Sequence, residues 1–183
     1  MCEYCGCQAV SVIAELTREH DTVVAMIGDA RTALERGDVA GAAASARRIA
    51  AVLGPHTAVE ENGLFPALED EFASHVAGLV AEHRHIETVL AEAARGTPVD
   101  PRWPARLIDT LRLLREHILK EQDGAFPAAL TSLRPSDWER IEGVRERFGR
   151  NAPDQSAGEP RVTVDDPHHA MAGDPAPSRG SDL

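Results

Sequence analysis

Two stretches of the chain share one pattern: His56-Thr57-Ala58-Val59-Glu60-Glu61-Asn62-Gly63-Leu64-Phe65-Pro66-Ala67 and His117-Ile118-Leu119-Lys120-Glu121-Gln122-Asp123-Gly124-Ala125-Phe126-Pro127-Ala128. Both read H-x3-E-x2-G-x-F-P-A. Residues four apart lie one turn above each other on the same face of an α-helix. Each stretch therefore projects an imidazole and a carboxylate in the same direction. The Gly and the Phe-Pro predict that the helix ends or kinks just past the glutamate.

The repeat extends beyond these two stretches. Glu19-His20 and Glu82-His83 precede them at nearly equal spacing, so the chain resembles two copies of one helical hairpin. Each hairpin offers one lone histidine and one His-x3-Glu pair, and Glu87 adds a carboxylate four residues after His83. The predicted metal ligands are His20, His56, Glu60, His83, Glu87, His117 and Glu121.

Apolar residues recur at helical spacing through most of the chain. The pattern predicts an all-α fold, an up-down four-helix bundle with a short fifth helix. Asp38 is a candidate N-cap, Gly37 a candidate C-cap, and Ser136 to Glu139 has the pattern of a capping box. The expected helices cover residues 9–35, 38–61, 74–94, 104–122 and 136–148, with a short helical turn over 66–72. We expect a Cys-rich segment over residues 1–8, the bundle over 9–150, and a disordered, acidic, Pro-rich tail over 151–183.

Composition narrows the function classes. The chain of 183 residues carries a net charge of −11, which argues against nucleic acid and anionic membranes as partners. No apolar run approaches the ~18 residues of a membrane span, and the N-terminus does not resemble a secretory signal. The three cysteines, Cys2, Cys5 and Cys7, crowd near the N-terminus and suggest reduced thiols in the cytoplasm. Their C-x2-C-x-C spacing suits zinc or redox chemistry, and the alternative is a frayed terminus with reactive thiols.

The candidate ligands can be counted against two six-coordinate ions. Four histidines and three glutamates, two of them bridging, together with one bridging solvent-derived ligand, leave about one position open. Mixed imidazole and carboxylate ligands favour two iron ions, with manganese as the alternative.

These motifs resemble the hemerythrin-like (HHE cation-binding) family over roughly residues 9–148. The resemblance rests on His20, His83, the two His-x3-Glu pairs and the G-x-F-P motif after each. It implies a four-helix bundle holding a non-haem di-iron centre, with Glu60 and Glu121 as bridging carboxylates. Glu87 stands where oxygen-carrying members have a second histidine, so the chain is similar to the bacterial three-glutamate subgroup, associated with peroxide-consuming redox activity. A carboxylate at that place should stabilise the ferric state.

Several neighbouring residues have competing interpretations. The residue equivalent to Glu87 in the first hairpin is Val24, which predicts that the open position lies beside Val24; a Val24→Glu change should then block azide or peroxide binding. Glu87 could instead be a solvated residue or a hydrogen-bond acceptor for an imidazole. Glu19 and Glu82 could support ligands or lie on the surface. We expect buried plugs at Phe65 and Phe126, and residues turned away from the centre at Glu61, His85, Gln122 and Asp123. His75 lies near a helix start and has no ligand-type residue four positions on.

The leading functional hypothesis is an enzyme that turns over a small oxidant (peroxide, dioxygen or nitric oxide) with an unknown reductant. Such an enzyme would act in the response to oxidative stress. No separate catalytic acid is evident, since Tyr4, the only tyrosine, lies outside the bundle. The alternative is a sensory or iron-handling module that binds oxygen, nitric oxide or iron without turnover. Iron storage is a third, weaker hypothesis, because one di-metal site would hold little iron.

Overall fold

The regular structure of the described part of the chain is entirely helical, which confirms the predicted all-α class. A computed structural model describes residues 11–149; the cysteine segment and the tail predictions lie outside this range. In order, the elements are α1 (Ser11–Glu35), α2 (Val39–Val59), the π-helical turn η2 (Glu60–Leu64), α3 (Phe65–Ala91), α4 (Trp103–Lys120), the π-helical turn η3 (Glu121–Ala125), α5 (Phe126–Ser132) and α6 (Pro135–Gly149).

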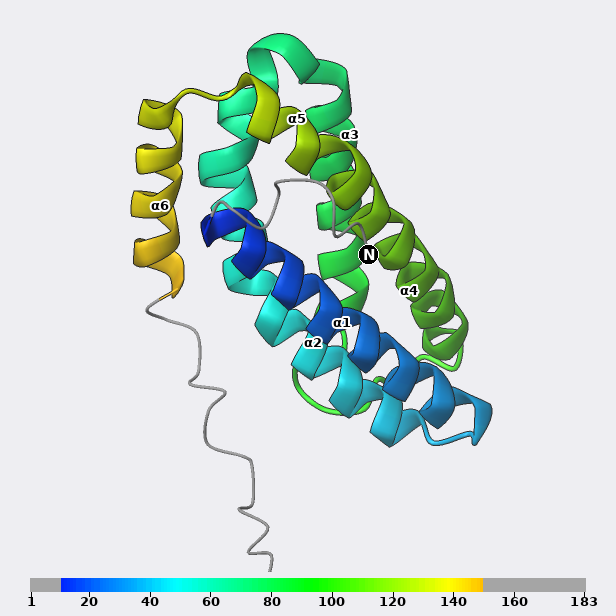
Figure 1. Cartoon of the computed structure of the whole chain (residues 1–183). Helices are drawn as coiled ribbons and strands as arrows, with labels where there is room; N and C mark the ends of the chain where they lie inside the picture. Colours follow the sequence, from blue (N-terminus) through cyan, green and yellow to red (C-terminus); the bar gives the residue numbers. More distant parts are fainter. Residues whose placement is uncertain (1–10, 150–183) are drawn as a thin grey trace, which may run out of the picture. The chain divides into compact units, whose positions relative to one another are not determined.

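The four long helices form the bundle. The hairpin of α1 and α2 lies against the hairpin of α3 and α4, and α6 packs on α1, α2 and η2 (Figure 1). Asp38 caps α2 as predicted, because its carboxylate accepts the Gly41 N–H at 2.8 Å. Gly37 ends the preceding hairpin helix with φ of 71°, a conformation that favours glycine.

The start of α6 differs from the predicted capping box. The helix begins at Pro135, which suits a first helical position because proline has no N–H to leave unpaired. The carboxylate of Asp137, not the Ser136 hydroxyl, reaches back to accept the Arg134 N–H at 3.0 Å. The helix therefore begins at Pro135, one residue before the predicted start at Ser136, and Asp137 takes the capping role expected of Ser136.

The repeated G-x-F-P motif does not end the helix, so that part of the prediction was wrong. The backbone widens into a π turn instead, and the Phe65 and Phe126 N–H groups donate to the Glu60 and Glu121 carbonyls. Proline lacks an N–H and its ring clashes with the carbonyl four residues back, and the wider turn relieves this conflict. The expected break before Ser74 is confirmed, because the backbone of Phe72 is non-helical (φ −128°, ψ 30°) and divides α3 into a short first helix and a longer second one.

A polar layer separates two apolar clusters in the bundle. One cluster contains Val23, Leu53, Ile86 and Leu114, and the other contains Leu16, Val59, Leu79 and Ala125, among further residues. Each predicted ligand histidine falls, along its helix, next to or between members of these clusters. The fold therefore places all four histidines at one level of the bundle.

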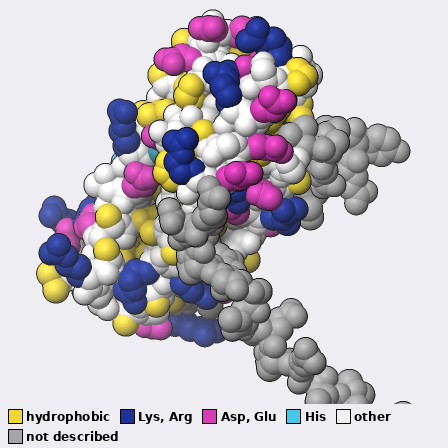
Figure 2. Space-filling model, turned by 90° about the vertical axis from the view of Figure 1, so that its left-hand side faces the viewer, with side chains coloured by type: hydrophobic (Ala, Val, Ile, Leu, Met, Phe, Trp, Pro, Cys, Tyr) yellow, Lys and Arg dark blue, Asp and Glu magenta, His cyan; other side chains and the backbone are white. Residues whose placement is uncertain are grey.

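On the face drawn in Figure 2, acidic and basic side chains are interspersed among apolar ones. Within residues 11–149, no helix combines the length and apolarity needed to cross a membrane.

Candidate metal centre

The four predicted histidines and two of the three predicted glutamates meet in the polar layer. All six side chains are buried, and the Glu60 and Glu121 carboxylates are fully excluded from solvent. Each long helix supplies one histidine, and the two glutamates come from the first residue of each π turn. The six residues are His20, His56, Glu60, His83, His117 and Glu121.

The Glu121 carboxylate is shared between two groups of candidate ligands. Its Oε2 lies 3.1 Å from His20 Nε2, and its Oε1 lies 2.9 Å from His117 Nε2. One group that could hold an ion is therefore His20, His56, Glu60 and Glu121, and the other is His83, His117 and Glu121. Glu60 also approaches both groups, since its Oε2 lies 3.3 Å from His56 Nε2 and 3.4 Å from His83 Nε2.

The chemistry of this donor set fits metal ions. Among the described residues, eight buried side-chain polar atoms lack a hydrogen-bond partner, and seven of them belong to this cluster. They include both carboxylate oxygens of Glu60 and of Glu121, and the Nε2 atoms of His20 and His117. Buried polar groups are normally paired, so such a concentration of free lone pairs indicates a site built for cations.

Three of the four histidines are also held from behind by a carboxylate. His56 Nδ1 lies 2.8 Å from Glu19, His83 Nδ1 lies 3.0 Å from Glu61, and His117 Nδ1 lies 2.9 Å from Glu82. Such a contact fixes the tautomer, because Nδ1–H donates outward and Nε2 presents its lone pair to the centre.

These outer contacts settle open questions and overturn one prediction. Glu19 and Glu82 support ligands rather than lying free on the surface. Glu61 was expected to point away, and that was wrong because η2 aims it at a histidine of the other hairpin. The equivalent residue in the second repeat is Gln122, and His20 Nδ1 has no partner in the described structure. In the sequence, this asymmetry is visible as the difference between Glu60-Glu61 in the first repeat and Glu121-Gln122 in the second.

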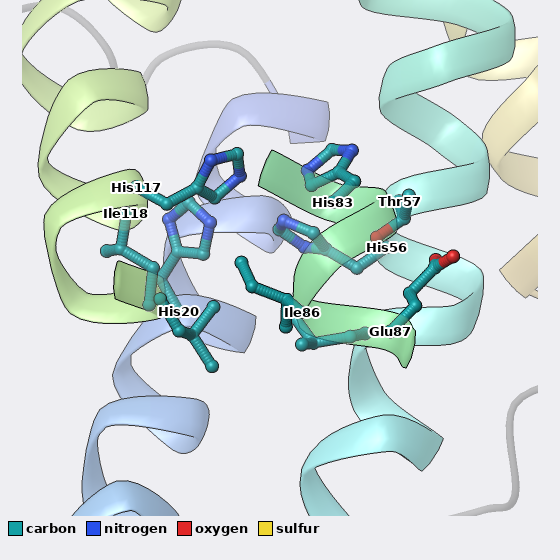
Figure 3. Close-up of a pocket in the computed structure, with 10 residues that line it drawn as sticks. His20, His56, Thr57, His83, Ile86, Glu87, His117 and Ile118 are labelled. Carbon is teal, nitrogen blue, oxygen red and sulfur yellow. The ribbon is translucent and has the colours of Figure 1, made fainter. Parts of the chain in front are cut away.

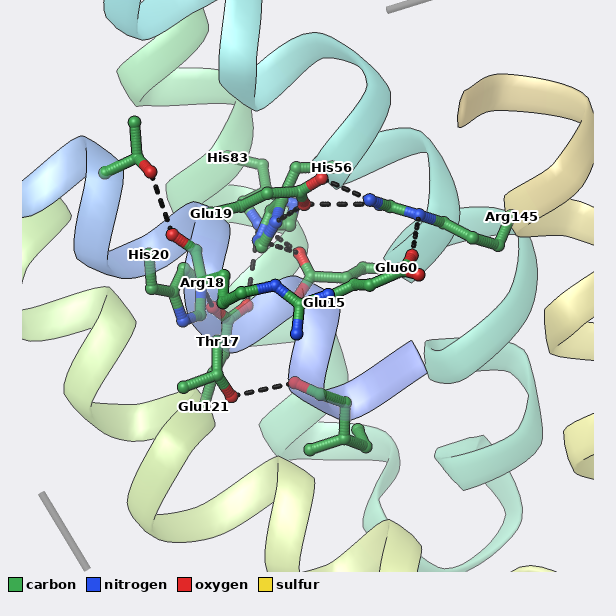
Figure 4. Close-up of polar contacts among 12 residues, drawn as sticks. Glu15, Thr17, Arg18, Glu19, His20, His56, Glu60, His83, Glu121 and Arg145 are labelled. Carbon is green, nitrogen blue, oxygen red and sulfur yellow. Dashed lines mark hydrogen bonds and ion pairs between the residues drawn. The ribbon is translucent and has the colours of Figure 1, made fainter. Parts of the chain in front are cut away.

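Two of the outer carboxylates are paired with cations. Arg145 of α6 binds both oxygens of Glu19 (Figure 4), and the Lys120 ammonium donates to Glu82. Burial would raise the pKa of Glu19, but the hydrogen bonds from His56 and Arg145 lower it to about 2. Burial likewise opposes the shift at Glu82, where Lys120 and His117 lower the pKa.

Without metal, the carboxylates draw protons onto the histidines. Burial alone would lower the pKa of His56 and of His83, yet the neighbouring carboxylates raise each to about 10. Burial would raise the pKa of Glu121, but the neighbouring imidazoles of His117, His20 and His83 hold it well below its usual value. In the absence of a cation, the carboxylates therefore favour the protonated form of His56 and of His83.

The phenylalanines of the repeated motif support the lone histidines across the bundle. Phe126 stacks on His20 with ring centroids 5.6 Å apart, and Phe65 stacks on His83 at 5.7 Å. Both rings are buried, as predicted for plugs that keep water from the site.

A small enclosed space adjoins the histidines. It has a volume of about 10 Å³, room for about one water molecule. Its walls include all four histidines and the residues Leu53, Thr57, Ile86, Glu87, Leu114 and Ile118 (Figure 3).

Two further predicted residues lie outside the buried cluster. Val24 does not line this space and packs, partly buried, against the apolar cluster, so the open coordination position beside it stays a prediction. Glu87 lies at its edge, but its side chain is exposed and turned away from the imidazoles (Figure 3), outside both ligand groups. On α1 and α3 the residue three after the histidine, Val23 or Ile86, takes the inward place. As expected, His85 and Asp123 are exposed, and His75 is exposed as well.

Fold and site together define a metal-binding helical bundle. The model of the Hemerythrin HHE cation binding domain matches residues 11–129, well over half of the chain, and the chain belongs to this family. No curated protein and no solved structure gave a match. The matched region contains every member of the buried cluster, whereas α6 lies beyond it.

Proposed function

We propose that the protein holds two iron ions and reacts with a small oxidant such as peroxide, dioxygen or nitric oxide. The observation that carries this proposal is the convergence of unpaired imidazole and carboxylate atoms in two groups that share Glu121. Imidazole and carboxylate ligands suit iron, with manganese as the alternative. When bound, two irons would supply redox chemistry and one open position for a small molecule.

The surrounding residues would select what reaches the ions. The enclosed space has room for about one water molecule, so it favours peroxide or a diatomic molecule over an organic substrate. Leu53, Ile86 and Leu114 form an apolar wall, and the buried rings of Phe65 and Phe126 exclude water beside the lone histidines. The outer carboxylates would keep three imidazoles in the tautomer that binds a cation.

The three-glutamate character of the site is part of this proposal. Glu87 borders the enclosed space one helical turn after His83, and its exposed side chain is free to change rotamer. We infer that Glu87 turns inward when metal is bound and adds negative charge to the centre. That charge would favour the ferric state and peroxide consumption over reversible dioxygen carriage.

The first experiment is the metal content of the untagged full-length protein, measured by plasma mass spectrometry. About two irons per chain are expected from the ligand set, followed by consumption of added peroxide with the metal retained. Zinc alone, at about one per chain, would contradict the proposal and move the chemistry to Cys2, Cys5 and Cys7. Retained iron without peroxide turnover, but with nitric oxide or dioxygen binding, would contradict the enzyme and support a binding module.

A further inference from the structure

Helix α6 lies outside the family-matched residues, yet one of its side chains reaches toward the metal centre. Arg145 is largely buried, with 17% of its side chain exposed. Its Nε donates to Glu15 at 2.9 Å, and its two terminal nitrogens contact the two carboxylate oxygens of Glu19 (Figure 4). A planar guanidinium that binds a carboxylate at two points fixes its orientation as well as its charge.

Glu19 in turn contacts a candidate metal ligand, His56, so the fixed orientation of Glu19 also fixes the His56 ring. Its Oε2 accepts from Arg145 Nη1 at 3.2 Å and meets His56 Nδ1 at 2.8 Å. The opposite nitrogen of the same ring, Nε2, faces Glu60 at 3.3 Å. A continuous series of contacts therefore runs from α6, through Glu19, to the group formed by His20, His56, Glu60 and Glu121.

The other hairpin obtains its cation in a different way. Glu82 holds His117 Nδ1 at 2.9 Å and receives a contact from Lys120, which lies on the same helix as His117. The Lys120 side chain is 44% exposed, and an ammonium on a flexible stem does not impose the geometry of a guanidinium. Among residues 11–149, only the His56 side is thus held by a largely buried cation from outside the four long helices.

We propose that α6 is a functional part of the metal centre and that Arg145 is a positioning residue that fixes His56 through Glu19. Loss of Arg145 leaves the Glu19 carboxylate without its cation and free to rotate. The His56 ring then loses its fixed orientation, and the ion held by the His56 group is released more easily. The inference rests on the proposed two-ion centre.

The test compares the affinities of both ions in full-length variants. Cobalt(II) is titrated against a competing chelator, in a background with Cys2→Ser, Cys5→Ser and Cys7→Ser so that thiolates do not bind the probe. The variant Arg145→Met removes the guanidinium at similar length, and Arg145→Lys restores the charge. Glu15→Gln is the matched control, because it removes the other partner of Arg145 and leaves Glu19 in place.

Arg145→Met should weaken one of the two cobalt ions about tenfold, as changes to residues that support metal ligands typically do, and shift its visible absorption. The second ion should change little. Arg145→Lys should recover most of the affinity, and Glu15→Gln should bind both ions normally.

Two results would overturn the assignment. In one, Arg145→Met binds both ions like the parent protein. In the other, Arg145→Met and Glu15→Gln weaken both ions equally and lower the melting temperature of the metal-free protein, which would limit Arg145 to anchoring α6. A parent protein that binds one ion at the bundle would contradict the two-ion centre instead, while the comparison of variants would still report on Arg145.

Discussion

Each imidazole of the centre turns its Nε2 atom inward, toward the glutamates, and its Nδ1 atom outward. The sequence predicts which carboxylates lie near Nε2 but not which residues contact Nδ1. The His-x3-Glu spacing places His56 with Glu60 on one helix face, because both residues share one local periodicity. The outer partner of His83 is Glu61, which comes from a different helical segment. Spacing along one helix carries no information about such a contact, so Glu61 was assigned to the surface.

Substitution of Glu87 tests whether this residue is the third carboxylate ligand. If its side chain turns inward on loading, Glu87→Gln removes a charged ligand, and the affinity for one ion should fall at least about tenfold. Glu116→Gln is the control, because Glu116 is also exposed, adjoins His117 in sequence and does not line the enclosed space. Both variants are assayed by chelator competition. Equal affinities in the two variants would assign Glu87 to the solvated surface.

The helices show why periodicity placed some side chains and not others. Residues three and four after a histidine lie on either side of its direction, at about −60° and +40°. After the histidines of α2 and α4, the fourth residue (Glu60 or Glu121) points inward, whereas after those of α1 and α3 the third does, as Val23 and Ile86 show. The sequence permits both choices, and the packing of the helices decides between them. The order of the four long helices and the start of α2 at its Asp38 cap were predictable because apolar stripes and caps are local, whereas the two π turns and α5 were not predicted.

The glycines of the repeated motif lie inside the π turns, and we expect that the π turn does not itself require a glycine. A Cβ added at Gly124 would lie 3.6 Å from His75 Nε2, an ordinary contact, and Gly124 is not among the glycines with positive φ. Glycine inside a helix costs about 0.5–1 kcal/mol relative to alanine. Gly124→Ala should therefore raise the free energy of unfolding by about that amount in urea denaturation. A loss of stability would show that the π turn itself requires glycine.

The whole molecule encloses a charged layer between two apolar clusters. Placing the Glu60 and Glu121 carboxylates in that layer costs several kcal/mol unless each is compensated. In the metal-free protein the compensation comes from protons on imidazoles, whose pKa the same carboxylates raise. Bound cations would replace these protons, so metal binding and folding stability should be linked through pH.

This linkage predicts opposite pH trends for the two forms of the protein. In the metal-free fold the pKa of His56 and of His83 is raised to about 10, above the 6.5 of an ordinary histidine. Their stabilisation is therefore fully present below about pH 6.5 and is lost as the pH rises toward 10. The melting temperature of chelator-treated protein should fall over that interval.

Loading with iron(II) under nitrogen should release protons and become tighter as the pH rises, because a ligating imidazole must be unprotonated. Calorimetric titration in buffers of different ionisation enthalpy measures the protons released. A metal-free protein whose melting temperature is constant from pH 6 to 9, or loading without proton release, would show that the histidines are already neutral and that the carboxylates are compensated in another way.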